Sequence, residues 1–464
     1  MLEQNDTICA IATRLGGALG VIRVSGPKAI EFTQAIFTAK SGKPLAQCRP
    51  YSIVFGTVYD RQPAVGNGGE ANNSNGQDTP TDSDIKNSCR ESASIVDEVL
   101  VSVFHAPHSY TGEDSTELSC HGSPYILQRI TSLLIQAGCR QAAPGEYTQR
   151  AFMNGKMDLS QAESVADLIA SDNASAHRIA MQQMRGGYSR KLAGLRDQLL
   201  ELTSLLELEL DFSEEDVEFA QRDHLRQLAM DIQAEIKRLA DSFSTGNALK
   251  NGVPVAIIGA PNVGKSTLLN ALLGDDRAIV SEIQGTTRDL IEDSVVIDGV
   301  QFRFIDTAGI RHTNDSIEQM GIERSLKAAA KARIVIMLTE PGVPYPDIPT
   351  LDGQTVLRIE NKTPQFQALT GIGLDALRCQ LVSSATNDTT DRDILVTNLR
   401  HYESLQHAHA SITRAIASMD SALSGDLIAE DLRQCIAHLS DILGSAITPS
   451  DVLQNIFSRF CIGK

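Results

Sequence analysis

The most constraining feature of the chain is the stretch Gly259–Ser266, which has the glycine, lysine and serine spacing of a phosphate-binding loop. An apolar run at 253–258 precedes it and a helical run at 267–273 follows it, which is the strand–loop–helix context that such a loop needs. Its glycines let backbone N–H groups close round phosphates, Lys265 can reach the β and γ oxygens, and Ser266 can ligate Mg²⁺. The stretch therefore predicts a nucleotide-binding α/β domain.

Two later strings indicate the class of nucleotide-binding domain. The apolar run 302–305 is typical of a strand and leads into Asp306–Gly309. An acidic residue there can hold Mg²⁺ through water, and a glycine beside the γ-phosphate can sense whether that phosphate is present. Between the two strings lies 285–289, where Thr286 or Thr287 can complete the Mg²⁺ shell. Three such strings in this order and at these separations are typical of a GTPase.

The residue after Gly309 departs from the Ras-like pattern. Ras-like GTPases place a glutamine there to orient the attacking water, whereas this chain has Ile310, which cannot hydrogen-bond to water. Catalysis therefore needs another water-orienting group and another source of positive charge. Glu318 is one candidate, although the residues alone favour an ordinary surface glutamate at the start of a helix over 321–332.

The base-recognition segment is shortened. GTPases usually carry Asn-Lys-x-Asp after a strand, and its aspartate accepts from guanine N1 and N2. Here strands are predicted at 334–338 and 356–359, and Asn361-Lys362-Thr363-Pro364 follows, with proline in place of the carboxylate. A string similar to the base-contacting loop comes only a few residues later, at 368–371. Either Asp375 or another carboxylate substitutes, or base selectivity is reduced.

Composition limits the remaining possibilities. The chain has 464 residues, enough for two to four domains, and its net charge is −17 from 41 Lys and Arg against 58 Asp and Glu. This balance opposes non-specific nucleic-acid binding, so any RNA contact needs local basic patches or a basic partner. The eight cysteines lack metal-ligand spacing, and no apolar run reaches the length of a membrane span. We expect a soluble, cytoplasmic protein with reduced thiols and no membrane association.

Periodicity divides the chain further. Residues 1–150 mix short β-like runs at 18–24, 51–59 and 96–104 with turns, an α+β pattern, and 63–94 is a polar stretch that predicts a disordered surface insertion. From 159 to 243 the apolar residues recur at helical spacing, with a leucine stripe from 192 to 210 that is typical of a bundle core. Helical spacing returns near the C-terminal end. These helical runs are predicted at 394–399, 427–443 and 452–457. A helical domain interrupted by a GTPase domain fits this order.

Over nearly its whole length the chain resembles the bacterial tRNA-modification GTPases of the MnmE (TrmE) family. The resemblance rests on the GTPase strings above, on a series of short N-terminal strings, and on the C-terminal Phe-Cys-Ile-Gly-Lys. These strings are Asp6–Ile8, Arg23–Gly26, Ser109–Asp114, Glu117–Leu118, His121–Gly122, Pro144–Tyr147, Arg150–Lys156, Asp158–Leu159, Gln161–Glu163 and Phe460–Lys464.

The resemblance implies a multidomain protein that combines α/β and α+β parts. It implies an α+β tetrahydrofolate-binding and dimerisation domain over 1–154, a discontinuous all-α domain over 155–251 and 388–464, and an inserted Ras-like GTPase domain over 252–387. The implied contacts to a formyl or methylene tetrahydrofolate are Arg23, Glu117, Lys156 and Lys464. Cationic groups can hold the folate carboxylate, and a glutamate can accept from the pterin edge. For Cys461 a functional thiol and a buried structural cysteine remain equally open.

The resemblance also implies a GTPase that is activated by K⁺-driven dimerisation instead of an arginine finger. The K⁺ donors are then Asn262, Ser281, Ile283 and Thr286, and the Mg²⁺ ligands are Ser266 and Thr287. Glu318 takes the water-orienting role. The implied GTP-binding residues are Asn262, Val263, Gly264, Lys265, Ser266, Thr267, Ser281, Glu282, Ile283, Gln284, Gly285, Thr286, Thr287, Asp306, Thr307, Ala308, Gly309, Asn361 and Lys362.

The implied reaction is GTP hydrolysis coupled to addition of an aminomethyl or carboxymethylaminomethyl group at C5 of the wobble uridine of certain tRNAs. A homodimer acts there with a flavin-dependent partner protein in a hetero-oligomer, and the carbon comes from the folate. Two other functions remain open. One is a GTPase that acts in ribosome assembly or as an RNA scaffold, and the other is a nucleotide-binding scaffold with reduced guanine specificity.

Overall fold

The computed structural model describes most of the chain. The described residues are 6–61, 93–211, 222–274, 293–305, 326–351, 353–386, 394–421, 423–445, 453, 456–458, 460 and 463. They fall into two compact units, which we treat separately: Met1–Ala162 with Ile447–Lys464, and Glu163–Ala446. The C-terminal stretch thus belongs to the first unit, although the sequence-based division places it with the helical segment 388–464.

The first unit is built on a seven-stranded sheet in the order β3-β4-β5-β6-β2-β1-β7. All neighbouring strands pair antiparallel except β1 and β7, which are parallel. Its strands are β1 Ile8–Ile11, β2 Leu19–Ser25, β3 Phe37–Ala39, β4 Ser52–Arg61, β5 Ala93–Phe104, β6 Ser115–His121 and β7 Arg140–Gln141. Its helices are α1 Ala29–Ile36, the 3-10 turn η1 Leu45–Gln47, α3 Pro124–Ala137 and α4 Glu146–Met153.

Alternation of apolar side chains explains why one face of this sheet is buried. Ile22 and Val24 of β2, Val99 to Val103 at every second place of β5, and Leu118 of β6 are almost fully buried with the apolar sides of α1 and α3. The predicted β-like runs at 18–24, 51–59 and 96–104 correspond to β2, β4 and β5. Ala93 and Ser94, which the predicted 63–94 insertion included, belong to β5 and pair with Arg61 and Asp60. The rest of that insertion lies outside the described residues.

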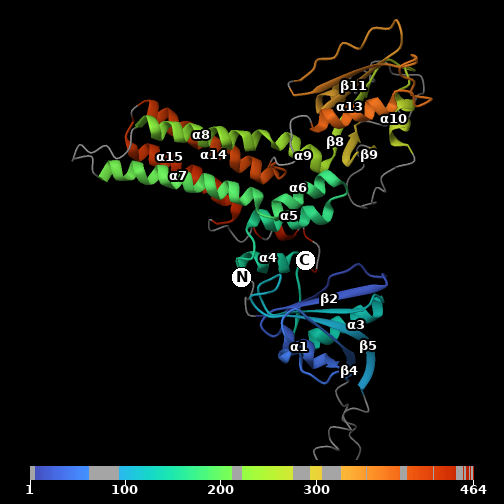
Figure 1. The fold of residues 1–464 in the computed structure, drawn as a ribbon, viewed down its shortest axis with the longest axis vertical. Helices are drawn as coiled ribbons and strands as arrows, with labels where there is room; N and C mark the ends of the chain where they lie inside the picture. The colour runs from blue at the N-terminus through green and yellow to red at the C-terminus, as the bar shows by residue number, and fades with distance from the viewer. Residues whose placement is uncertain are drawn as a thin grey trace, which may run out of the picture. The chain divides into compact units, whose positions relative to one another are not determined.

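The second unit contains a five-stranded sheet in the order β12-β11-β8-β10-β9. The strands β12, β11, β8 and β10 pair parallel, and β9 adds an antiparallel edge. Helices α9, α10 and α13 lie near this sheet (Figure 1). Its strands are β8 Val253–Ile258, β9 Asp293–Ile297, β10 Val300–Phe304, β11 Ile334–Thr339 and β12 Thr355–Glu360, and the helices are α9 Phe243–Asn251, α10 Lys265–Leu273 and α13 Leu374–Thr386.

Strand β11 is buried at every residue, and β8 at all but one, because the parallel sheet is covered on both faces. One face packs a core that includes Val255, Ile257 and Leu268, and the other packs Ala256 and Ile258. The strands predicted at 253–258, 302–305, 334–338 and 356–359 are all present within one or two residues. The observed order is that of an open α/β sheet, in which ligands bind at the carboxyl ends of the strands.

The remaining helices of this unit include a bundle in which α7, α8, α14 and α15 run alongside one another (Figure 1). The predicted leucine stripe packs its core, since Leu192, Leu195, Leu199 and Leu202 are buried. The helices outside the sheet are α5 Leu159–Ala170, α6 Ala174–Met184, α7 Gly187–Asp211, α8 Arg222–Asp241, α14 Leu399–Asp420 and α15 Gly425–Leu443. Helix α5 crosses the boundary between the two units.

The helical run predicted at 394–399 is wrong. Residues 394–398 form no helix, and α14 begins only at Leu399, with Asn398 as its N-cap. The apolar side chains there are consecutive, and the backbone is used by neighbours instead of by a helix: the Val396 N–H donates to Ser242 Oγ at 3.1 Å, and the Leu395 carbonyl accepts from Gln183 Nε2 at 3.1 Å. Tertiary hydrogen bonds therefore decide this segment.

Candidate functional site

The phosphate-binding loop connects the end of β8 to the start of α10, as predicted. Gly264 is the N-cap of α10 and has φ +95°, and Asn262 also adopts a positive φ of +64°. A Cβ on Gly264 would come within 2.5 Å of Asn361 Nδ2, and one on Gly259 within 2.3 Å of the Leu338 carbonyl oxygen. Only glycine fits at both places. The first-turn N–H groups of α10 have no partner within the helix and carry the positive end of its dipole, which favours an anion.

Lys265 lies folded over this loop. Its ammonium donates to the carbonyl oxygens of Gly259 and Ala260 at 2.9 and 2.8 Å. Burial lowers its pKa below the ordinary value for lysine, because the charged form loses hydration there. A partly desolvated cation beside a loop of backbone N–H donors is suited to phosphate oxygens, because their negative charge replaces the hydration that the ammonium lost on burial. The residues present therefore fit a nucleoside phosphate.

Asn361 joins the phosphate loop to the predicted base-contacting segment. Its side chain is 4% exposed, Nδ2 donates to the Val263 carbonyl oxygen at 2.8 Å, and Oδ1 accepts from the Ala368 N–H at 3.0 Å. Lys362 follows with φ +61°, and its ammonium pairs with Glu340. The structure thus brings Asn361 to Val263 and Gly264, three of the residues predicted to bind GTP.

The proline-containing segment after Lys362 forms a tight turn. Thr363 and Phe366 exchange backbone hydrogen bonds at 3.1 and 3.3 Å, and Thr363 Oγ1 also accepts from the Phe366 N–H at 3.0 Å. Pro364 stands at the second place of this turn, which its fixed φ suits. Asp375, the suggested substitute for the missing carboxylate, is 96% exposed at the side chain and contacts Arg378 at 3.4 Å. Its position gives no support to a role as a buried acceptor.

Several predicted residues lie outside the described part of the chain, and their roles remain predictions. They are Ser281, Glu282, Ile283, Gln284, Gly285, Thr286, Thr287, Asp306, Thr307, Ala308, Gly309, Glu318, Cys461 and Lys464. Asn262 is consequently the one predicted K⁺ donor, and Ser266 the one predicted Mg²⁺ ligand, whose surroundings are described. In the described ranges no group of three or more His, Cys, Asp or Glu side chains could hold a metal ion.

In the first unit, Arg23 and Glu117 form one cross-strand pair. They are directly opposite in the β2–β6 ladder, and Nε and Nη2 of Arg23 both lie 2.8 Å from Oε1 of Glu117. Nη1 of Arg23 donates to the Gly463 carbonyl oxygen at 3.4 Å. Two of the predicted folate contacts are therefore in direct contact with each other, next to the residue that precedes Lys464.

Two tyrosines that sequence reasoning assigned no role complete this cluster. The Arg23 guanidinium lies 5.4 Å from the ring centre of Tyr110 and 5.6 Å from that of Tyr147, and the Tyr147 hydroxyl donates to the Arg23 carbonyl oxygen at 2.8 Å. Both tyrosines belong to strings that carried the family resemblance, so the sequence held a signal that could have marked them as site residues. Lys156 donates to the Pro107 carbonyl oxygen at 2.9 Å, in the same loop as Tyr110. Cation, carboxylate and aromatic faces together fit an aromatic ligand that carries a carboxylate.

An ion-pair network fixes α4, the helix that carries Tyr147 of this cluster. Arg150 contacts Asp6, Glu113 and Glu146, and Arg140 contacts Asp6 and Glu146. Burial alone would raise the pKa of Glu146, but Arg140, the Ala143 N–H and Arg150 together hold it below its ordinary value. Because the Glu146 carboxylate is fully buried, this network ties α4 to Arg140 of β7 and to Asp6 only while that carboxylate stays charged.

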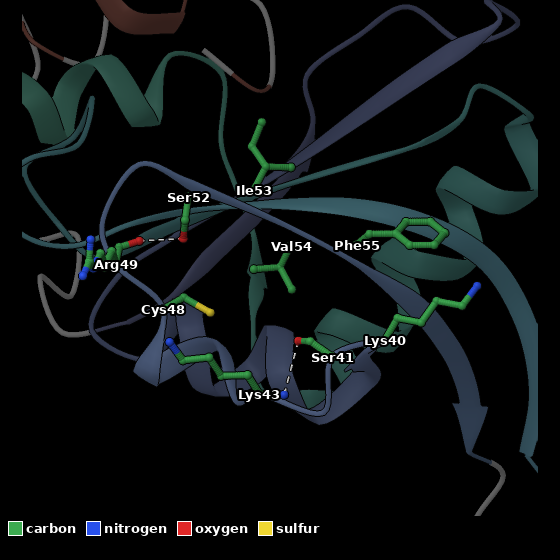
Figure 2. Close-up of a pocket in the computed structure, with 9 residues that line it drawn as sticks. All are labelled: Lys40, Ser41, Lys43, Cys48, Arg49, Ser52, Ile53, Val54 and Phe55. Atoms are coloured by element: carbon green, nitrogen blue, oxygen red, sulfur yellow. Dashed lines mark hydrogen bonds between the residues drawn. The ribbon is translucent and has the colours of Figure 1, made fainter.

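A cavity of about 550 Å³ on the first unit concentrates positive charge. Lys40, Lys43 and Arg49 line it, together with polar and apolar side chains (Figure 2). No acidic residue lines it, and within the described residues neither Lys43 nor Arg49 forms an ion pair. Lys40 lies 4.9 Å from the ring centre of Phe55 and 3.5 Å from Glu98. In a chain of net charge −17, this cavity is a local basic patch. Its other lining residues are Ser41, Cys48, Ser52, Ile53 and Val54.

The fold and the loop define a P-loop nucleotide-binding protein, and comparison with known families specifies it further. The model described as "MnmE helical domain" matches residues 159–461, more than half of the chain, and the model described as "GTP-binding protein TrmE N-terminus" matches residues 7–156. The chain belongs to the MnmE (TrmE) family of tRNA modification GTPases.

Curated relatives match from end to end. Proteins named tRNA modification GTPase MnmE from Phocaeicola vulgatus and Bacteroides fragilis are each 51% identical, over 502 and 496 residues; the first comparison covers 100% of both chains, the second 99% of this chain and 100% of the relative. The protein of the same name from Cytophaga hutchinsonii is 43% identical over 488 residues, covering 100% and 98%.

The cytosolic domain of the T. maritima FeoB iron transporter, a solved structure in GDP form, is 18% identical. It covers 40% of this chain and 96% of that domain, and its TM-score of 0.20 is too low to support any argument. None of the helices that the structure describes is long and apolar enough to cross a membrane.

Proposed function

We propose that this chain is a K⁺-stimulated GTP hydrolase that acts in modification of the wobble uridine of tRNA. The observation that supports nucleotide binding is the structure of the phosphate-binding loop. Only glycine fits at Gly264, the Asn361 side chain donates to the Val263 carbonyl oxygen, and the Lys265 ammonium lies over the loop. The relatives' name, tRNA modification GTPase, supports the reaction and the RNA substrate. It gives no support to the alternative of a ribosome-assembly GTPase.

The loop holds the phosphates through its backbone N–H groups, and Lys265 exchanges its two carbonyl partners for phosphate oxygens when nucleotide binds. Ser266 and Thr287 are the proposed Mg²⁺ ligands, and Asn262, Ser281, Ile283 and Thr286 the proposed K⁺ donors. Bound metal ions would supply positive charge against the phosphates, the role that an arginine finger plays in other GTPases. Glu318 orients the attacking water, because Ile310 cannot.

Hydrolysis of GTP should therefore be at least tenfold faster in KCl than in NaCl at equal ionic strength, and Glu318→Ala should abolish turnover while GTP still binds. Glu403→Ala, at an exposed glutamate of α14, is the matched control and should turn over normally. Equal rates in the two salts would exclude K⁺ stimulation. Full activity of the Glu318 variant would exclude that residue as the water-orienting group.

We also propose that the cluster of Arg23, Glu117 and the two tyrosines binds a formyl or methylene tetrahydrofolate, with Lys156 and Lys464 as further cations. Some N–H donors of Arg23 remain for a ligand carboxylate, and the exposed ring of Tyr110 suits a flat ring, whereas the buried Tyr147 supports Arg23 from below. The proposal further includes a homodimer and a flavin-dependent partner protein. Titration calorimetry with tetrahydrofolate tests the site; absence of binding heat with correctly folded protein would reject it.

The basic patch at Lys40, Lys43 and Arg49 is the described surface that we propose for contact with tRNA phosphates. Overall negative charge opposes RNA binding, so a surface on which lysine and arginine outnumber carboxylates has to provide the attraction. Phe55 adds an aromatic face next to a lysine, the combination on which unpaired bases stack. Its test is among the predictions of the Discussion.

A further inference from the structure

The segment from Asn361 to Leu374 decides how the nucleotide base is read. We infer that this chain binds the guanine base without reading its 2-amino edge, so that GTP and inosine triphosphate (ITP), which lacks the 2-amino group, bind with nearly equal affinity. The inference rests on the proposed function and specifies the selectivity of the same site.

The base-side loop keeps its supporting hydrogen bonds. Asn361 bridges the Val263 carbonyl oxygen and the Ala368 N–H, at 2.8 and 3.0 Å, from a buried position. The backbone pairing of Gln367 with Ile372 closes the loop that follows. A degenerate, unused site would have no reason to keep a buried amide satisfied at both ends, because each lost partner costs stability. The loop therefore remains suited to a base.

The residue that replaces the carboxylate is fixed in a turn and offers no acceptor. In the Asn-Lys-x-Asp pattern the acceptor for guanine N1 and N2 stands three residues after the asparagine, and that place is Pro364. Proline offers no side-chain acceptor, and the hydrogen bonds between Thr363 and Phe366 fix it in a two-residue turn. After this turn the chain continues directly to Ala368. The described residues 361–374 contain no aspartate or glutamate.

The other described carboxylates in this part of the sheet are exposed or already paired. Over 326–351 and 353–386 the described acidic residues are Glu340, Asp347, Glu360 and Asp375. Glu340 is paired with Lys362, and the other three are exposed. An acceptor that discriminates between bases must be held in place, because an exposed carboxylate stays hydrated and loses entropy on ordering. Glu340 is held by Lys362 and not by a contact that aims it at a base, and the three exposed carboxylates have no such anchor.

The consequence follows from hydrogen-bond energetics. A carboxylate that is held in place makes charge-assisted hydrogen bonds to the base. When the base lacks one of the two donors, the affinity for the nucleotide therefore changes by about 10- to 100-fold. Without it, the N1 and N2 edge keeps its water, since Pro364 is exposed and the Leu369 side chain nearby in sequence is 87% exposed. Loss of the 2-amino group then changes little. We expect the affinities for GTP and ITP to agree within about threefold.

The test is competition binding of GTP and ITP to the full chain with Mg²⁺ present. Pro364→Asp should restore the acceptor and raise the preference for GTP over ITP to about tenfold. Gln365→Asp places the same charge one residue away, and Pro364→Ala removes the proline without adding a carboxylate. Both controls should retain equal affinities. Hydrolysis rates need not be compared, so the measurement does not depend on the K⁺ mechanism.

A preference of tenfold or more for GTP in the unaltered chain would overturn the inference, because it would show an N1 and N2 acceptor elsewhere. Equal affinities in Pro364→Asp would also count against it, since the added carboxylate would then not face the base. If neither nucleotide binds, the proposed function fails as well, and this outcome is distinct from tight but selective binding.

Discussion

The two sheets of the molecule build their candidate sites in different ways. In the five-stranded sheet the site lies where parallel strands end, and backbone groups of the loop at Gly264 form it. In the seven-stranded sheet the site lies on a strand face, where the ladder sets the side chains of Arg23 and Glu117 opposite each other. The first depends on backbone conformation and the second on charged side chains.

This difference determines what each site tolerates. A backbone site is sensitive to any added Cβ but indifferent to the titration of side chains, because its donors are peptide N–H groups. A side-chain site survives small backbone shifts but depends on the charge and planarity of a few groups. The variants below test this contrast, beginning with the largest expected effect.

Gly264→Ala should lower the affinity for GTP by about a thousandfold. The new Cβ would meet Asn361 Nδ2 at 2.5 Å and would strain a backbone with φ +95°, so the phosphate donors move. Nucleotide titration calorimetry measures the loss. Gly342→Ala, at φ +80° with nothing within 4 Å, is the matched control for backbone strain alone and should bind GTP normally. Similar losses in both variants would contradict the steric argument.

Arg23→Ala should weaken tetrahydrofolate binding by roughly 10- to 100-fold, since the pair with Glu117 and the contacts with two tyrosine rings are lost together. Arg23→Lys should recover only part, because lysine keeps the charge but not the planar fork. Lys28→Gln, at another exposed cation of this unit, serves as control. Full recovery by lysine would show that the charge of residue 23 is sufficient and that its planar shape is not needed. The proposed dependence of this site on side-chain planarity would then be wrong.

Replacing Lys40, Lys43 and Arg49 together with glutamine should weaken binding of tRNA by about tenfold at roughly 0.1 M salt. The log–log slope of affinity against salt should become shallower by about 2 to 3. Fluorescence anisotropy with labelled tRNA gives both numbers. Lys28→Gln and Lys237→Gln should leave them unchanged. An unaltered slope in the triple variant would remove the basic patch from the tRNA surface.

Acid should loosen α4 in the first unit before it affects the phosphate loop. The pKa of Glu146 is lowered in the folded state, so its stabilisation is complete above the unfolded value of about 4.3 and is lost as pH falls through the lower folded value. We expect a local loss of about 1 kcal/mol between pH 5 and pH 3. Hydrogen exchange of residues 144–156, corrected for intrinsic rates, measures it; equal protection at both pH values would contradict the expectation.

The phosphate loop could be predicted from sequence because its parts are contiguous: a strand, eight residues and a helix stand in order. The brace from Asn361 to Val263 joins residues that are 98 positions apart, and no local pattern shows it. Arg23 and Glu117 are 94 positions apart, and they could be named only through resemblance to a family. Their contact with each other, and with Tyr110 and Tyr147, needed the register of the sheet.

The wrong helix at 394–399 has a similar cause. Helical spacing was inferred from apolar residues, but whether a backbone coils depends on where its N–H and carbonyl groups find partners. Ser242 and Gln183, both far away in sequence, supply those partners at Val396 and Leu395. Local periodicity cannot reveal such a competition, whereas it located α7 and α15 well because those helices use their own backbone groups.

The long hairpin of β4 and β5 has a practical consequence. Its described ladder extends to the pair Arg61 and Ala93, so these two residues lie opposite each other on adjacent strands. A polypeptide inserted between Arg61 and Ala93 can therefore begin and end at neighbouring positions without straining either strand. We therefore expect that an affinity tag or a fluorescent reporter can be inserted between Arg61 and Ala93. Shortening the chain between these two residues should also leave the sheet intact.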